Sequence, residues 1–301
     1  MQDSSSRIRA DSPRRAPEGL EGLRAKLLEW RNADGGWGYS RGKRSRLEST
    51  CWALLALGQR DSEAVRVLES WARRDGWFID VPGTPPNYAF NAVAALTLRH
   101  LAPGSATAAA LVRRLADTKG KTFAASKVVR QNNGIAAWPW VADTASWIEP
   151  TAWALLLLKA ARQDGGYAGL DARIEAGEAL LFDRVCHDGG WNYGNPHVFE
   201  KNLWPYVPTT ALGLLALQDR REQSIVTRSL AQMRSDLETE RSPYALAIAL
   251  LAMRVCDADT DAVRAVAGRL EADVANGLAS VVSIAMALTA LAPEGSKAFT
   301  L

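Results

Sequence analysis

The sequence predicts an all-α protein, an (α/α)6 toroid in which six inner helices form a ring inside six outer helices. Three observations lead to this prediction. Segments that are apolar on nearly every side alternate with amphipathic segments, and a turn with glycine and tryptophan recurs before the apolar ones. A helix without a polar face has to be buried all round, whereas a one-faced helix can cover it from outside. Strand patterns are nearly absent.

The repeat shows first in the apolar segments, which we take as inner helices. Four units carry the turn or a degenerate form of it, and two more have only the apolar segment. In chain order the units are 34–57, a degenerate one from 75, one that ends at 158, 188–217, 244–253 and 281–291. Self-similarity of this kind indicates an architecture built from one repeated structural unit.

The amphipathic segments precede the apolar ones. Apolar residues recur at helical spacing near residues 20, 106 and 223, and within 64–72, 174–185 and 263–274. We predict an outer helix at each place and a short extra helix at 121–130. Residues 18–301 then form a single toroid domain. Residues 1–17, where arginines lie among Ser, Asp and Pro, are expected to form a disordered arm.

The Asp-Gly-Gly-Trp turn has a structural explanation. Its glycines allow positive φ where an outer helix ends, Asp can accept hydrogen bonds from nearby backbone, and Trp returns to pack between helices. Aromatic side chains contribute to packing before anything else. Trp37, Trp77 and Trp191 are therefore expected to be staples between helices.

Composition bounds the function classes. The chain has 301 residues, 48% of them hydrophobic, and a formal charge of +3, too small to indicate nucleic acid as a partner. Cys51, Cys186 and Cys256 form no CxxC pair, which argues against a disulfide framework or a cysteine-based zinc site. Without a secretory pattern or a run of about 18 apolar residues, a cytoplasmic protein is expected. The basic arm also allows peripheral contact with an anionic membrane.

The helical repeat with Asp-Gly-Gly-Trp turns resembles the terpenoid cyclase and protein prenyltransferase toroids, which carry the repeat called the QW motif. The resemblance covers the chain from about Gly19 onward, although the family's Gln before the motif Trp is Arg31 in the first unit. Squalene-hopene cyclases have two such barrels, and this chain has residues for one. It resembles the prenyltransferase β subunit and the monodomain class II cyclases. A hydrophobic polyisoprenoid substrate is what the resemblance implies.

The resemblance also implies a candidate acid. Class II cyclases protonate an alkene or epoxide with a carboxylic acid at the start of an inner helix, within Asp-Cys-Thr-Ala among other motifs. In register with it, this chain reads Glu149-Pro150-Thr151-Ala152. The implied reaction is protonation-initiated cyclisation without a cofactor, with Mg²⁺ expected only for a diphosphate substrate. Asp143 lies in a weaker echo of the same motif, Asp143-Thr144-Ala145.

Two physical arguments bear on Glu149. The reaction needs a carboxyl group that stays neutral in a dry pocket, so burial must raise its pKa, while the helix N-terminus favours the anion. Glu48-Ser49-Thr50 repeats the spacing of Glu149-Pro150-Thr151 in the first unit. A repeat-wide structural role, such as bonding helix-end N–H groups, is therefore the alternative, although Glu is not a favoured N-cap residue.

A cavity inside the toroid would be lined by aromatic residues from the inner helices and the loops before them. Aromatic faces stabilise cations by roughly 0.5 to 2 kcal/mol each, which suits a carbocation, and the same rings could also fill a solid core. The candidates are Trp52, Tyr88, Phe90, Trp138, Trp140, Trp147, Trp153, Trp204 and Tyr206.

Three other functions remain open. A prenyltransferase would need a zinc ion with Asp, Cys and His ligands, but Cys186 and His187, beside Asp183, diverge as neighbours on a helix, so no metal site is expected. A carbohydrate-active enzyme would need two carboxylates roughly 5 to 10 Å apart, a requirement that Glu48 and Glu149 could meet. A non-catalytic toroid would bind an isoprenoid or a protein.

Overall fold

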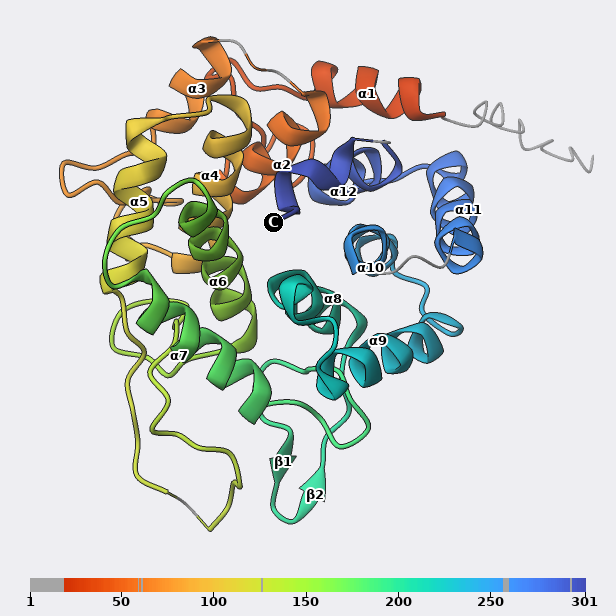
Figure 1. The fold of residues 1–301 in the computed structure, drawn as a ribbon. Coiled ribbons are helices and arrows are strands. Elements are labelled where there is room, and N and C mark those ends of the chain that lie inside the picture. Colours follow the sequence, from red (N-terminus) through yellow and green to blue (C-terminus); the bar gives the residue numbers. More distant parts are fainter. Residues whose placement is uncertain (1–18, 59, 61, 126, 257–259, 293) are drawn as a thin grey trace, which may run out of the picture.

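The structure, a computed structural model, describes residues 19–58, 60, 62–125, 127–256, 260–292 and 294–301. Over these residues, helices alternate between an outer and an inner ring (Figure 1), which confirms the predicted (α/α)6 toroid. The predicted arm, residues 1–17, lies outside the described residues. The outer helices are α1 (Leu20–Glu29), α3 (Ser62–Glu69), α5 (Ala106–Asp117), α7 (Leu170–Asp183), α9 (Ser224–Leu237) and α11 (Thr260–Asn276).

The inner helices make a closed ring. Each one contacts the next along the chain, and the last contacts the first. They are α2 (Leu47–Leu57), α4 (Tyr88–Leu101), α6 (Ile148–Gln163), α8 (Val207–Ala216), α10 (Pro243–Cys256) and α12 (Val281–Leu291). Almost every residue of these helices is buried, as their lack of a polar face requires. All six run in the same direction through the ring, so their N-termini share one end, here called the mouth.

Tryptophans fasten the two rings together at the turns. Trp37, Trp138 and Trp191 are fully buried, and each indole N–H donates at 2.6–2.7 Å to a carbonyl near the end of α1, α5 or α7. In the degenerate unit, Trp77 stands where the second glycine would be, and Phe78 occupies the buried Trp position instead. The staple role expected of Trp77 therefore belongs to Phe78.

The middle of the inner ring is filled by aromatic side chains. Trp52 of α2 and Trp153 of α6 meet with their ring centroids 6.0 Å apart. Phe299, at the end of the short helix η2 (Gly295–Phe299), packs on both at 5.4 and 5.8 Å. Its carbonyl accepts a 2.8 Å bond from the Gln218 amide in η1 (Gln218–Arg220), which holds the segment in place.

Two segments project from the toroid, and we call their described residues the lobe: 121–125, 127–131 and 195–204 (Figure 1). The helix predicted at 121–130 is wrong for the described residues there, because their backbone pairs with other segments. Val129 bridges to Val198, and the Phe199 N–H donates to the Val128 carbonyl. The second segment is a hairpin of β1 (His197–Val198) and β2 (Lys201–Asn202).

Candidate active site

Glu149 lies in the first turn of α6, at the mouth. Its carboxyl is half-buried, and among the described residues it has neither a hydrogen-bond donor nor an ion-pair partner. The residue of this motif with a structural role is Thr151, two positions after Glu149. Thr151 Oγ1 accepts the backbone N–H of the staple Trp138 at 3.2 Å and lies 3.3 Å from its carbonyl. In the described part of the chain, Glu149 itself caps no helix end, and Thr151 is the residue of the motif that holds the loop of Trp138.

The repeat places Glu48 at the equivalent position of α2. Thr50 binds the Trp37 N–H at 2.9 Å, as Thr151 binds that of Trp138. Unlike Glu149, however, Glu48 has a partner, because the Tyr39 hydroxyl donates to its Oε2 at 2.8 Å. The two carboxyl groups therefore share a position in the repeat and differ in their surroundings.

An acidic residue from the next turn organises the Glu48 side of the mouth. Asp80 accepts the Leu47 N–H at 2.7 Å, which caps α2, and it also accepts the Arg46 Nε–H at 2.8 Å. The Arg46 guanidinium lies 5.1 Å from the centre of the Tyr39 ring. Tyr39 is thereby fixed between the arginine and Glu48.

Helical spacing places the two acids above the central tryptophans. Residues four apart lie on the same face of a helix, one turn above the other. Trp52 follows Glu48 by four residues and Trp153 follows Glu149 by four. Because Trp52 and Trp153 touch across the ring, Glu48 and Glu149 face one another above an aromatic floor.

The electrostatics agree with this geometry. Burial, and after it repulsion by the Glu48 carboxylate, raises the pKa of Glu149 to about 7. Burial also raises the pKa of Glu48, although the hydrogen bond from Tyr39 opposes this shift. The pKa of Tyr244, at the start of α10, is raised by burial and by both acids, so its hydroxyl stays protonated. Near neutral pH, Glu149 therefore exchanges its proton readily.

The aromatic residues predicted to line a cavity fall into three groups. Trp52, Trp153 and Trp138 are core residues, each at most 4% exposed. Those at junctions with the core are buried or half-buried: Tyr88, Phe90, Trp140 and Trp147. Trp204 and Tyr206 are exposed at 73% and 52%. The rim near Glu149 also includes Tyr193, whose carbonyl accepts the Ile148 N–H and whose ring lies 5.6 Å from that of Tyr206.

Asp143 belongs to a different part of the mouth. It is exposed, has a φ of 60°, and borders an open cavity of about 380 Å³ together with Tyr88 and Arg114. Its charge raises the pKa of Tyr88, and it does not contribute to the pKa of Glu149. The structure therefore separates the two acids that the sequence motif suggested.

The sequence did not indicate Tyr39 and Tyr244 as parts of the site. Tyr39 lies in the loop after the first Trp, and only the fold brings its hydroxyl to Glu48. Tyr244 could have been found, because it opens the apolar segment 244–253 and therefore stands at the mouth end of an inner helix.

The residues of the prenyltransferase alternative do not come together. Asp183 pairs with Arg184 and accepts the Asn132 N–H, Cys186 is buried, and His187 is exposed. Over the described residues, no three His, Cys, Asp or Glu side chains are arranged to hold a metal ion. At the basic run near α2, Arg46 is engaged by Asp80 and Arg41 by Glu29.

Comparison with known proteins gives the fold. No protein-family model and no curated protein matches the chain. A type II terpene cyclase from Scytonema matches with a TM-score of 0.55 and 15% identity over 92% of this chain and 96% of its own. The ent-copalyl diphosphate synthase from Streptomyces platensis matches with a TM-score of 0.56 and 18% identity over 84% of this chain and 50% of its own.

Carbohydrate-active toroids match as well. One is an α-1,6-mannanase of Salegentibacter sp., an inactive variant with two adjacent aspartates replaced, in complex with α-1,6-mannotriose. Its TM-score is 0.61 and its identity 10%, over 93% of this chain and 98% of its own. At identities this low, the structural matches establish only that these proteins share the toroid fold. That fold hosts more than one chemistry. None of the helices in the described part of the chain is long and apolar enough to cross a membrane.

Proposed function

We propose that the mouth is an acid-catalytic site at which Glu149 protonates a polyisoprenoid and starts a class II cyclisation. One observation carries the proposal. Glu149 is a half-buried carboxyl group without a structural partner among the described residues, with a pKa raised to about 7, one helical turn above an aromatic floor. Groups with strongly perturbed pKa values and no structural role are the usual candidates for chemistry.

The chemistry follows from this arrangement. Neutral Glu149 gives its proton to one carbon of an alkene, whose π electron pair forms the new C–H bond. The cation left on the neighbouring carbon is attacked by the next alkene, and loss of a proton to water ends the sequence. Glu149 regains a proton from solvent, which its half-exposed position allows. Before the reaction, the negative charge of Glu48 favours the neutral form of Glu149. After protonation, it stabilises the carbocation of the substrate.

The surroundings of Glu149 suit an apolar substrate. Its neighbours at the rim are Trp147, Tyr193, Tyr206 and Tyr244, whose π faces attract a cation. Because Trp52, Trp153 and Phe299 fill the ring below, the substrate would lie in the mouth and not deep inside the toroid. Two adjacent acidic residues, of the kind replaced in the inactive mannanase variant, occur nowhere in this sequence.

Glycoside hydrolysis is the second candidate, and one observation favours it. Glu48 and Glu149 face each other and repel, so one carboxyl can be neutral while the other is charged. A neutral acid opposite a carboxylate is the arrangement that cleaves glycosidic bonds.

The test is turnover by purified protein of squalene, geranylgeranyl diphosphate and α-1,6-linked mannooligosaccharides. We expect a cyclised isoprenoid and a loss of about 10²–10⁴-fold in rate for Glu149→Gln. The matched control is Glu175→Gln, which removes an exposed carboxyl from outer helix α7. Full activity of Glu149→Gln would refute Glu149 as the acid. If the wild-type protein releases mannose and forms no cyclised isoprenoid, the site is a glycoside hydrolase site.

A further inference from the structure

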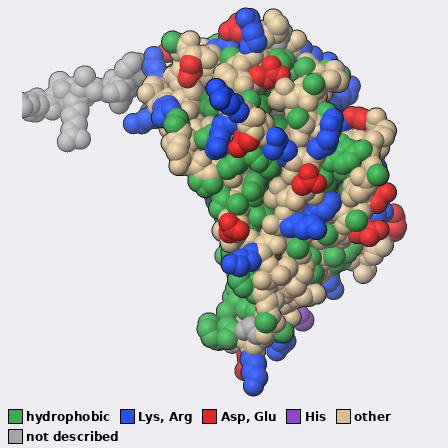
Figure 2. All heavy atoms as spheres, turned by 90° about the vertical axis from the view of Figure 1, so that its left-hand side faces the viewer, with side chains coloured by type: hydrophobic (Ala, Val, Ile, Leu, Met, Phe, Trp, Pro, Cys, Tyr) green, Lys and Arg blue, Asp and Glu red, His purple; other side chains and the backbone are tan. Residues whose placement is uncertain are grey.

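The lobe concentrates exposed apolar side chains. It holds half of the ten large hydrophobic residues that are exposed in the described chain: Phe123, Val128, Phe199, Leu203 and Trp204. Phe199 and Trp204 are 72% and 73% exposed, more than any other of the ten. Figure 2 shows hydrophobic side chains beside Lys and Arg side chains at the lower end of the molecule, where the lobe projects. Exposed apolar groups gathered in one place usually mark a contact surface.

The hairpin turn keeps one of these residues exposed despite its conformation. Phe199 and Glu200 form a two-residue turn with φ values of 48° and 62°, in the left-handed region. Asn and Gly are the residues that such a turn prefers, and a bulky side chain there costs free energy. Phe199 neither suits the turn nor packs in the core, so its position is not explained by folding.

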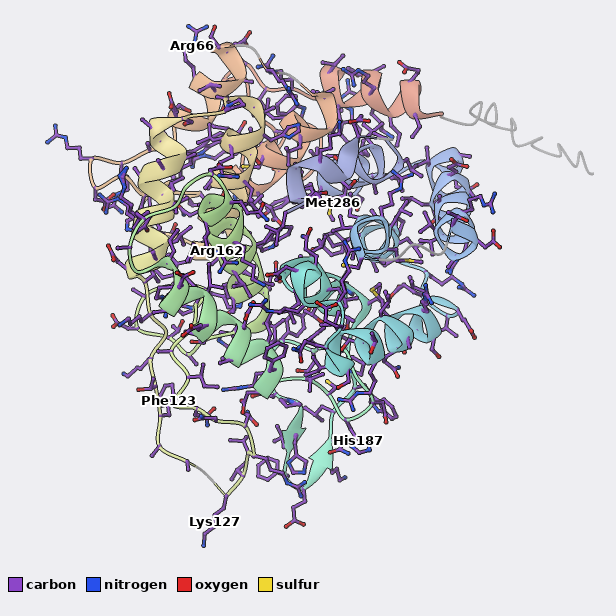
Figure 3. All side chains as sticks on the ribbon, viewed as in Figure 1. Arg66, Phe123, Lys127, Arg162, His187 and Met286 are labelled. Atoms are coloured by element: carbon purple, nitrogen blue, oxygen red, sulfur yellow. The ribbon has the colours of Figure 1, made fainter. Side chains whose placement is uncertain are left out.

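The charge of the lobe identifies its partner. Lys121, Lys127, Arg130 and Lys201 are opposed only by Glu200, which gives the lobe a net charge of +3. Lys127 points away from the toroid (Figure 3). Aromatic residues that enter the interface of a bilayer, surrounded by cations that meet anionic headgroups, are the chemistry of peripheral membrane binding.

We infer that the lobe docks the toroid on an anionic phospholipid bilayer, with Phe199 and Trp204 in the interface and the lysines at the headgroups. This surface differs from the N-terminal arm, for which the sequence analysis only allowed membrane contact. Pro205 and Tyr206 join the second lobe segment to α8, and the Tyr206 ring lies 5.6 Å from that of the rim residue Tyr193. Docking would therefore bring the mouth close to the membrane, where isoprenoids partition. The docking itself does not depend on the proposed cyclisation.

The experiment measures co-sedimentation of the full chain with vesicles of phosphatidylcholine, with and without phosphatidylglycerol. We expect binding to the anionic vesicles that weakens as salt is raised. Phe199→Asn suits the left-handed turn and should fold, yet it should bind about tenfold more weakly. Lys127→Glu should weaken binding about 25-fold, because each charge near the surface contributes about fivefold and the reversal changes the charge by two. The control Arg74→Glu makes the same charge change at an exposed position outside the lobe.

Three outcomes would overturn the inference. Equal sedimentation of wild type and Phe199→Asn, or no sedimentation with either vesicle, excludes docking through the lobe. Dimerisation in solution that Phe199→Asn abolishes would assign the surface to a second copy of the chain. Turnover of a detergent-solubilised substrate should be unchanged in Phe199→Asn, so a failure of docking can be distinguished from a failure of the proposed reaction.

Discussion

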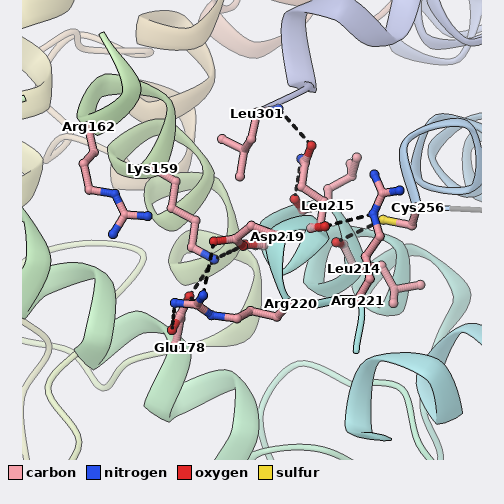
Figure 4. Close-up of polar contacts among 12 residues, drawn as sticks. Lys159, Arg162, Glu178, Leu214, Leu215, Asp219, Arg220, Arg221, Cys256 and Leu301 are labelled. Carbon is pink, nitrogen blue, oxygen red and sulfur yellow. Dashed lines mark hydrogen bonds and ion pairs between the residues drawn. The ribbon is translucent and has the colours of Figure 1, made fainter. Parts of the chain in front are cut away.

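The two ends of α6 carry charged clusters that differ in one respect. At the far end from the mouth, Lys159 is 1% exposed and its ammonium has three partners (Figure 4): the carboxylates of Glu178 and Asp219 and the carbonyl of Ala216. Arg220 adds two bonds to Glu178 at 3.1 Å. At the mouth, Glu149 has no such partner among the described residues.

The contrast separates a structural cluster from a functional one. An ammonium has three donors, and the three partners of Lys159 satisfy all of them. Satisfied buried charges hold elements together, here α6, α7 and η1. A carboxyl group left between its two charge states adds little to stability, and folding alone gives no reason for its position. The predictions below test this contrast from the largest effect to the smallest.

Removing the buried cation should be the most damaging change. Lys159→Met would leave the partly buried Asp219 carboxylate without its main partner and Glu178 with Arg220 alone, and breaking a buried ion pair typically costs about 3–5 kcal/mol of unfolding free energy. Urea unfolding at pH 7 measures the loss. Arg162→Met, one turn along α6 at a 40% exposed position, is the control and should change stability by less than about 0.5 kcal/mol. If Lys159→Met lost less than about 1 kcal/mol of unfolding free energy, the cluster would not have the structural role described above.

The second prediction separates two residues of one motif at the mouth. Thr151→Val keeps the shape of the side chain but leaves the buried Trp138 N–H without its acceptor, which should cost about 1–3 kcal/mol. Thr227→Val, on the exposed side of α9, serves as the control. Thermal unfolding of both variants and of Glu149→Gln gives the comparison. If Glu149→Gln were the more destabilised, Glu149 and not Thr151 would be the structural member of the motif.

The third prediction concerns pH. The pKa of Glu149 is raised from its ordinary 4.5 to about 7 in the folded protein, so the folded state binds this proton more tightly than the unfolded state. The stabilisation is complete below about pH 4.5 and is lost as the pH rises through 7. Between pH 5 and pH 8, wild type should therefore lose about 2–3 kcal/mol of unfolding free energy relative to Glu149→Gln. Parallel pH profiles of the two proteins would contradict the raised pKa.

How far the sequence could predict the molecule depends on the range of the contacts. The Asp-Gly-Gly-Trp turns and the apolar segments are local patterns. They were enough to predict the two rings of helices and the position of Glu149 at the start of an inner helix. Lys159 interrupts an apolar segment, but no pattern pairs it with Glu178 or Asp219. The contact of Phe299 with Trp52 likewise exists only because the ring closes, and no local pattern predicts it.

The last prediction concerns the link between the two acids. Glu48→Gln removes the negative charge that is the smaller cause of the raised pKa of Glu149, and it leaves burial, the larger cause, in place. The pKa of Glu149 should therefore fall and still remain above its ordinary value, which NMR titration of its labelled carboxyl carbon would measure. Asp143→Asn is the matched control, because that charge does not act on Glu149. An unchanged pKa in Glu48→Gln would mean that the acids do not interact across the mouth. Because a glycosidase would need Glu48 as the second carboxylate, while a cyclase needs only the neutral acid, turnover by the same variant distinguishes the two reactions.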